Sequence, residues 1–274
     1  KIIAVPGAEF KIWDCQKNDW VTQMRTPDGA MIDVFVTNEE GYFITPEELV
    51  GGEYVLYEVK APEGYYLNPK YTTPKNKSDL GNTDVSGIKL SLTTQLAVQE
   101  DERGNLIYPI QVENEPLKGK IKVIKTGEML TDITTEVSEY GDIVRPSYNY
   151  RGLEGVEYTI KLKEDAKSPD GKETYEKAGK TYVITTNENG EAITDELYLG
   201  TYEIKETKTP KGFVTDKDIP DIVVTNTDET ERVKTNIKEL QNIKQKTEIE
   251  IIKEFEKSKF VLDQEEKIEV ADDL

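Results

Sequence analysis

Short runs of alternating apolar and polar residues, separated by turn-forming residues, recur along the chain. Val, Ile, Tyr and Phe fill the apolar positions, which is the pattern of half-buried β-strands. Turn signals such as PDG at Pro27 and NENG at Asn187 lie between these runs. The pattern predicts an all-β chain of β-sandwiches. The clearest strands are expected over residues 10–13, 32–36, 54–57, 121–124, 182–184 and 202–204.

Residues 233–245 form a segment whose apolar spacing also fits a helix. Its apolar positions are Val233, Ile237, Leu240 and Ile243. This spacing is weak evidence for a helix, and the comparison of repeats below favours a strand for part of the segment.

Two segments share one residue pattern. Residues 52–65 read GEYVLYEVKAPEGY and residues 200–213 read GTYEIKETKTPKGF, 148 positions later. The same offset relates GAEF at residues 7–10 to GVEY at residues 155–158. A shared spacing of this length indicates at least two copies of one domain.

A second repeated feature, an Asn followed by a Lys, has a shorter offset. Asn114 precedes Lys125 by 11 positions, and Asn242 precedes Lys253 by 11 positions, with 128 positions between the two Asn residues. The offset is 20 less than 148, so the first copy carries an insertion of that length between its repeated block and its Asn. We expect this insertion to be a long exposed loop around residues 68–84.

These marks divide the chain into three parts. We expect a first repeat at residues 1–116 that lacks its first strand, a complete second repeat at residues 117–246, and the start of a third repeat or a C-terminal extension at residues 247–274. The third part is too short to bury its own core. It could pack on the second repeat, stay partly extended, or complete the opened first repeat of a neighbouring molecule.

Composition argues against several classes of function. The chain has no His and one Cys, Cys15, which removes His-based triads, most zinc sites and an intrachain disulfide. Cys15 is expected to be a buried or half-buried free thiol. A net charge of -19 argues against a nucleic-acid partner. We expect no metal, no cofactor and, within this sequence, no membrane insertion.

The repeated block resembles the E-box of Cna-B (collagen-adhesin B-type) domains, which also occur in backbone pilins of Gram-positive bacteria. The Gly-x-Glu-aromatic strands, the first strand ending in Lys and the last strand bearing Asn match in the same order. The resemblance implies tandem inverse immunoglobulin-like β-sandwiches. It also implies an extracellular, cell-wall-anchored protein and, as in many members, an internal Lys–Asn isopeptide bond.

Carried over residue by residue, the resemblance gives the second repeat a full set of bond-forming residues. Lys125 is on the first strand, Glu206 in the E-box is the assisting carboxyl, and Asn242 is on the last strand. Asn226 is a second candidate partner for Lys125, but it lacks the 11-position relation to a following Lys.

The other repeats hold partial sets. The first repeat has Glu58 and Asn114, and its Lys is expected upstream of Lys1. Lys253 would be the reactive Lys of the third part. Asn114 and Lys253 are therefore candidates for cross-links with absent or other partners.

The chemistry of such a bond follows from burial. An amine attacks a carboxamide only when it is unprotonated, and burial between two sheets lowers the pKa of Lys125. Burial also favours a protonated Glu206, which would donate a hydrogen bond to the side-chain oxygen of Asn242. Holding two groups in contact is worth an effective molarity of roughly 10⁵ M or more. This is a single reaction of the protein on itself, so the chain is not expected to be an enzyme.

Two functions fit these features. The first is a stalk or pilin-type segment, whose partners are neighbouring domains of the same surface protein or pilus. The alternative is an adhesin module that binds a host matrix protein through long loops. The loops in question are residues 69–84 and residues 126–149, with Tyr140, Tyr148 and Tyr150 in or beside the latter.

Overall fold

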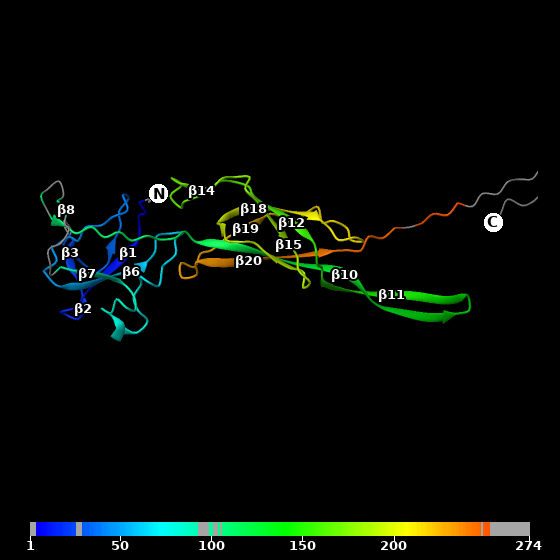
Figure 1. Cartoon of the computed structure of the whole chain (residues 1–274), viewed down its shortest axis with the longest axis horizontal. Coiled ribbons are helices and arrows are strands. Elements are labelled where there is room, and N and C mark those ends of the chain that lie inside the picture. The colour runs from blue at the N-terminus through cyan, green and yellow to red at the C-terminus, as the bar shows by residue number, and fades with distance from the viewer. Residues whose placement is uncertain are drawn as a thin grey trace, which may run out of the picture. The chain divides into compact units, whose positions relative to one another are not determined.

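The computed structural model describes residues 4–25, 29–92, 99–100, 104, 106–247 and 249–252. The chain forms two compact units, Lys1–Lys244 and Gln245–Leu274. The described residues are nearly all strand and loop (Figure 1), with one short 3-10 helix among them, η1 (Lys77–Asp79). No helix in this part of the chain is long and apolar enough to cross a membrane.

The strands of the first repeat are short. They are β1 (Glu9–Asp14), β2 (Asp19–Trp20), β3 (Gln23–Arg25), β4 (Ala30–Ile32), β5 (Phe35–Val36), β6 (Glu53–Lys60), β7 (Ile88–Ser91), β8 (Gln99–Glu100) and β9 (Leu106–Ile107).

Two strands of the second repeat, β10 and β11, are much longer than the rest. The strands are β10 (Lys118–Ser138), β11 (Gly141–Gly152), β12 (Glu157–Leu162), β13 (Ala166–Lys167), β14 (Thr174–Glu176), β15 (Thr181–Thr185), β16 (Glu191–Ile193), β17 (Leu197–Tyr198), β18 (Gly200–Lys208), β19 (Ile222–Val224) and β20 (Val233–Asn242).

The second repeat is a sandwich of two sheets. One sheet has the order β11-β10-β16, with β17 and β20 also paired to β10, and the other has the order β15-β12-β18-β19. Inward-facing side chains such as Ile121, Val123, Ile160 and Ile204 form a single apolar core between them. The predicted all-β sandwich fold is therefore confirmed.

The first and last strands of the second repeat, β10 and β20, are parallel neighbours. Their register runs from Lys118 opposite Val233 to Gly127 opposite Asn242. Residues 233–242 therefore form a strand, as the repeat comparison favoured. The strand is held by its ladder with β10, which outweighs the weak helical spacing of its apolar residues.

The first repeat has the same central strand pair. Its main sheet has the order β2-β1-β6-β7, with β5 on β1. Its β1–β6 pair and the β12–β18 pair of the second repeat share a register shift at the same place. As a result Phe10 lies opposite Glu58, and Tyr158 lies opposite Glu206. The repeat in the sequence is thus a repeat in the structure, down to a single β-bulge.

The first repeat differs where the second has β10. No described strand pairs along residues 108–115, although Val112 packs on the core. The contacts at the end of this segment include a hydrogen bond from Tyr66 N to Glu115 O and a bridge between Tyr65 and Pro116. Among the described residues, the position beside this segment has no strand.

The insertion of the first repeat is less exposed than expected. Leu80 packs against Trp13, Val55 and Tyr57 on the face of the β1–β6 sheet opposite the main core, and Gly81 N donates to Tyr57 Oη at 2.8 Å. These large side chains need cover, so the loop folds back over them, while residues 75–78 stay exposed.

Two smaller expectations are corrected. Cys15 is free, but it is exposed, because it lies in the turn after β1. The strand expected over residues 32–36 is broken by a bend between β4 and β5.

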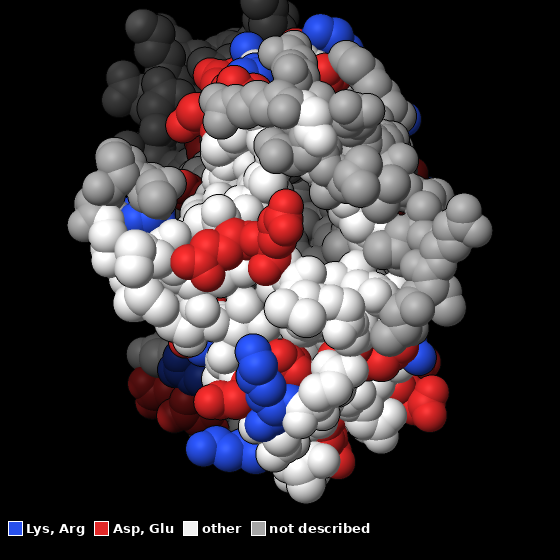
Figure 2. All heavy atoms as spheres, turned by 90° about the vertical axis from the view of Figure 1, so that its left-hand side faces the viewer, with Lys and Arg blue, Asp and Glu red and all other residues white. Residues whose placement is uncertain are grey.

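On the face of the first repeat shown in Figure 2, acidic and basic side chains are scattered among uncharged ones. The described residues of this face form no broad basic surface.

Candidate functional site

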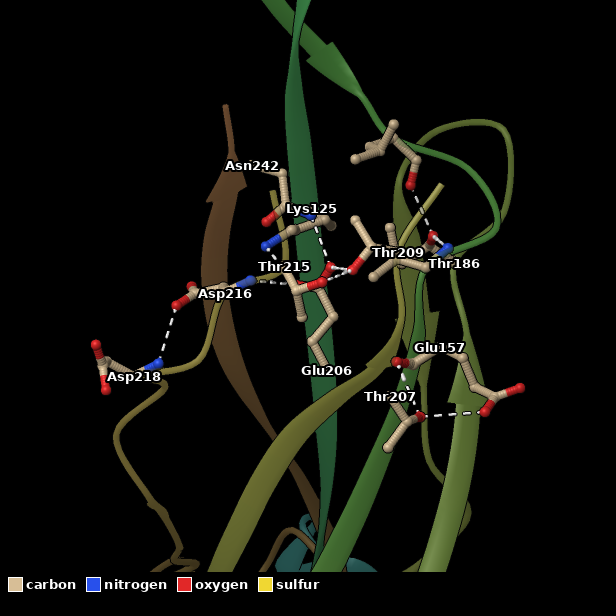
Figure 3. Close-up of polar contacts among 12 residues, drawn as sticks. Lys125, Glu157, Thr186, Glu206, Thr207, Thr209, Thr215, Asp216, Asp218 and Asn242 are labelled. Atoms are coloured by element: carbon tan, nitrogen blue, oxygen red, sulfur yellow. Dashed lines mark hydrogen bonds and ion pairs between the residues drawn. The ribbon is translucent and has the colours of Figure 1, made fainter. Parts of the chain in front are cut away.

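Three strands of the second repeat each place one polar side chain in its interior (Figure 3). These are Lys125 of β10, Glu206 of β18 and Asn242 at the end of β20, with exposed fractions of 0%, 8% and 1%. Strands β10 and β20 belong to one sheet and β18 to the other, so the cluster joins the two layers.

Lys125 is buried by the alternation of its own strand, because it continues the inward row of Ile121 and Val123. Its Nζ lies 3.2 Å from Glu206 Oε2 and 6.0 Å from the centre of the Tyr158 ring. The ion pair lacks hydrogen-bond alignment, and no described group gives Nζ a well-aligned bond. Burial lowers the pKa of Lys125, and the neighbouring Glu206 carboxylate only partly opposes this.

Glu206 connects the Lys nitrogen to the Asn nitrogen. Its Oε1 accepts from Asn242 Nδ2 at 2.7 Å and from Thr209 Oγ1 at 2.7 Å. Its Oε2 faces Lys125 Nζ and accepts from Asp216 N at 3.4 Å. Each carboxylate oxygen therefore touches one of the two nitrogens that a Lys–Asn bond would exchange.

The side-chain amide of Asn242 is turned the other way from the orientation predicted above. The predicted hydrogen bond runs from Glu206 to the side-chain oxygen, whereas in the structure the amide nitrogen faces Glu206. Asn242 Oδ1 is buried without a hydrogen-bond partner among the described residues. A buried carbonyl left unpaired costs about 1–3 kcal/mol, and a catalytic role is one explanation for such a group.

Sequence reasoning missed the hydroxyl groups beside Glu206. Thr209 and Thr215 lie 2.7 Å apart, oxygen to oxygen, and Thr209 also contacts Glu206. One signal was available, because the two E-boxes differ at this place: the position of Thr209 is taken by Ala61 in the first repeat.

Asn226, the second candidate partner, lies elsewhere. Its side chain is buried and donates to Lys118 O at 3.2 Å and to Glu231 O at 2.6 Å. These bonds hold the turn between β19 and β20, at the Lys118 end of β10 and not at the Lys125 end.

The first repeat contains the matching carboxyl and amide. Glu58 is 1% exposed, and Asn114 Nδ2 lies 2.9 Å and 3.0 Å from its two oxygens. Burial raises the pKa of Glu58 to about 7; the hydrogen bond from Asn114 lowers it, and the Glu229 carboxylate raises it further. None of the ion pairs between described residues includes Glu58.

Lys253, the candidate of the third part, lies outside the described residues. No group of three or more metal-ligating side chains is found in the part of the chain that the structure describes.

Residues 3–89 and 147–239 match the SpaA family of prealbumin-like fold domains. Both matched segments include an E-box Glu, Glu58 or Glu206, while Lys125 and Asn242 lie outside them. No curated protein matches the chain.

Three solved structures are among those similar to this chain. The TIE protein of Bacillus anthracis is 21% identical over 88% of this chain and 31% of its own, with a TM-score of 0.40. The minor pilin GBS52 of Streptococcus agalactiae is 15% identical over 92% of this chain and 88% of its own, with a TM-score of 0.32. The full-length major pilin SpaD of Corynebacterium diphtheriae is 25% identical over 46% and 30%, with a TM-score of 0.27. The chain spans about a third of the length of the TIE protein.

Proposed function

Because this chain belongs to the SpaA family of prealbumin-like fold domains, we propose that it is a stalk or pilin-type segment of a Gram-positive cell-surface protein. In this proposal the second repeat is rigidified by an isopeptide bond between Lys125 and Asn242, which forms without an enzyme. The partners are neighbouring domains of the same extracellular, wall-anchored protein or pilus.

The observation that carries the proposal is the buried Lys125–Glu206–Asn242 cluster. A Lys is almost never fully buried, since its ammonium loses its hydration there. Here a buried Lys faces a buried carboxylate, which in turn contacts a carboxamide nitrogen. A stabilising ion pair alone would not need the Asn, and the unpaired Asn242 oxygen adds a cost that such a pair does not explain.

The contacts support a balanced reaction. Glu206 Oε2 takes a proton from Lys125 Nζ, and the free amine attacks Asn242 Cγ to form the Nζ–Cγ bond. The Cγ–Nδ2 bond then breaks as Nδ2 receives a proton through Glu206 and leaves as ammonia. Glu206 ends as it began, and the Lys ammonium and the Asn carboxamide become one secondary amide and one ammonium ion.

The position of the bond determines which residues carry load. Because β10 and β20 are parallel, the start of β10 and the end of β20 lie at opposite ends of their ladder. Tension entering at Lys118 would pass along β10 to Lys125, cross the bond to Asn242 and leave the second repeat through the chain that follows Asn242. The residues between Lys125 and Asn242 would carry no tension, so the sandwich would not be pulled open.

Glu206→Ala tests the role of the carboxyl. This change keeps Lys125 and Asn242 but removes the group that moves the proton, so we expect linkage to slow by about 10²–10⁴-fold. The measurement is intact mass at intervals after synthesis, because linkage removes the mass of one ammonia. Glu203→Ala on the same strand is the control and should link normally. Linkage of Glu206→Ala at the wild-type rate would remove Glu206 from the mechanism.

The first repeat has the acceptor half of the same chemistry. Glu58 and Asn114 are buried together, and a strand ending in Lys beside residues 108–115 would complete the set. We propose Lys253 of a neighbouring molecule as one source, because its spacing from Asn242 equals that of Lys125 from Asn114. In this chain alone, the first repeat should carry no bond.

A second candidate function, the adhesin module, is favoured by the β10–β11 ribbon. The connection expected over residues 126–149 is a two-stranded ribbon whose outer part is exposed on both faces. The register places a group of apolar residues on one face, and all are 44–81% exposed: Leu130, Ile133, Val137, Val144, Tyr148 and Tyr150. An exposed apolar face of this kind marks a binding surface.

Two neighbouring substitutions separate the faces of the ribbon. Val144→Ser alters the apolar face, whereas Ile143→Ser alters the opposite face next to Glu136. If the chain is an adhesin, Val144→Ser should weaken binding to immobilised host matrix proteins by about tenfold, from the loss of one buried side chain. Ile143→Ser should leave that binding unchanged. Equal effects of the two changes, or no binding by the wild type, would exclude this function for the ribbon.

A further inference from the structure

We propose that Thr209 is a positioning residue for the Lys125–Asn242 linkage, holding Glu206 so that one carboxylate oxygen faces each reacting nitrogen. This inference rests on the proposed isopeptide chemistry and adds a residue that neither the repeat pattern nor the family match identifies.

The hydroxyl of Thr209 is oriented by a second hydroxyl. Thr209 Oγ1 donates its single proton to Glu206 Oε1 at 2.7 Å. In its 2.7 Å contact with Thr215, it must therefore be the acceptor, and Thr215 must be the donor. The result is a chain of two hydrogen bonds, from Thr215 to Thr209 and from Thr209 to Glu206, that ends on Oε1 of the carboxylate.

Fixing that oxygen also places the other one. Rotation about the last bond of a Glu side chain meets little resistance, so the carboxylate plane is set by its partners. Oε1 is held by Thr209 and by Asn242 Nδ2, which leaves Oε2 facing Lys125 and the Asp216 amide. A carboxylate held in this way can accept a proton from one nitrogen and deliver a proton to the other.

The first repeat shows the carboxylate without the hydroxyl. Ala61 occupies the position of Thr209. Both oxygens of Glu58 accept hydrogen bonds from the same nitrogen, Asn114 Nδ2, at 2.9 Å and 3.0 Å. In the second repeat only one oxygen of Glu206 bonds the Asn nitrogen. Because no Lys among the described residues of the first repeat pairs with Glu58, the test must change the hydroxyl while Lys125 is kept.

Thr209→Val is the test, since Val keeps the shape and removes the hydroxyl. The linked fraction is followed by intact mass after cell-free synthesis of the full chain, with samples stopped in denaturant. We expect linkage to slow by about tenfold, the equivalent of one lost hydrogen bond to a charged group. Thr209→Ser should restore the rate to within about twofold. Thr207→Val, which removes a neighbouring hydroxyl that contacts Glu157, should link at the wild-type rate.

The pH profile provides a readout that altered packing would not move. With Glu206 turned away from Lys125, the amine must lose its proton to water. The rate of Thr209→Val should therefore rise more steeply with pH than that of the wild type.

The outcomes separate the two proposals. If the wild type never loses ammonia, the isopeptide function fails. If the wild type links and Thr209→Val links equally fast, only the role of Thr209 fails. Equal slowing of Thr209→Val and Thr209→Ser, with unchanged pH profiles, would mean that the residue acts through packing, and this would also overturn the inference.

Discussion

Asn242→Ala is expected to remove the cross-link and to lower the free energy of unfolding of the second repeat by about 4–5 kcal/mol. The bond would close a loop of 117 positions between Lys125 and Asn242, and chain entropy gives about this value for a loop of that size. Denaturant unfolding followed by tyrosine signals measures the difference.

Two further variants isolate the effect of the bond. Asn236 lies on the same strand, and its side chain bonds only to backbone atoms. Asn236→Ala should therefore keep the cross-link and lower the free energy of unfolding by about 1 kcal/mol. Lys125→Met should lose the cross-link, and the double change with Asn242→Ala should cost much less than the sum of the two single changes. Additive losses would mean that no covalent bond joins these residues.

The first repeat is expected to be more stable at pH 5 than at pH 8. The pKa of Glu58 is raised from a usual 4.5 to about 7 in the folded state, mainly by burial. A group with a raised folded pKa gives its full stabilisation below pH 4.5, and this is lost as the pH rises through 7. The loss is up to about 3 kcal/mol, from 1.36 kcal/mol per pKa unit.

The tryptophans make this measurement specific. The chain has two, Trp13 and Trp20, and both lie in the first repeat, so their fluorescence reports its unfolding separately. Glu58→Gln is the matched variant, because it keeps the shape and cannot titrate. The wild type should lose stability between pH 5 and pH 8 relative to Glu58→Gln. Parallel curves for the two proteins would show that Glu58 is not titrating in this range.

Much of the fold followed from the sequence. The Cna-B-type resemblance and the all-β sandwich are confirmed, because alternating residues and a fixed repeat are local signals that survive in the folded chain. The positions of Lys125, Glu206 and Asn242 could be expected for a similar reason. Each lies at an inward position of a strand, and strand alternation determines the face.

Other features depended on contacts that no local pattern carries. The direction of the Asn242 amide and the hydroxyl pair behind Glu206 arise where three separate segments meet. The insertion was expected to be exposed because its composition is polar, yet Leu80 covers a second cluster on the far side of its sheet. A connection was expected over residues 126–149, where the structure has the β10–β11 ribbon. The bulge between Leu130 and Asp132 interrupts the alternation of polar and apolar residues that would have predicted long strands.

The intact mass of the folded protein tests the central claim most directly. We expect a deficit of one ammonia relative to the mass calculated from the sequence. A peptide map should then contain one branched peptide that joins Lys125 to Asn242. A full calculated mass, with both residues recovered in separate peptides, would contradict the covalent mechanism and leave the second repeat as an unlinked sandwich.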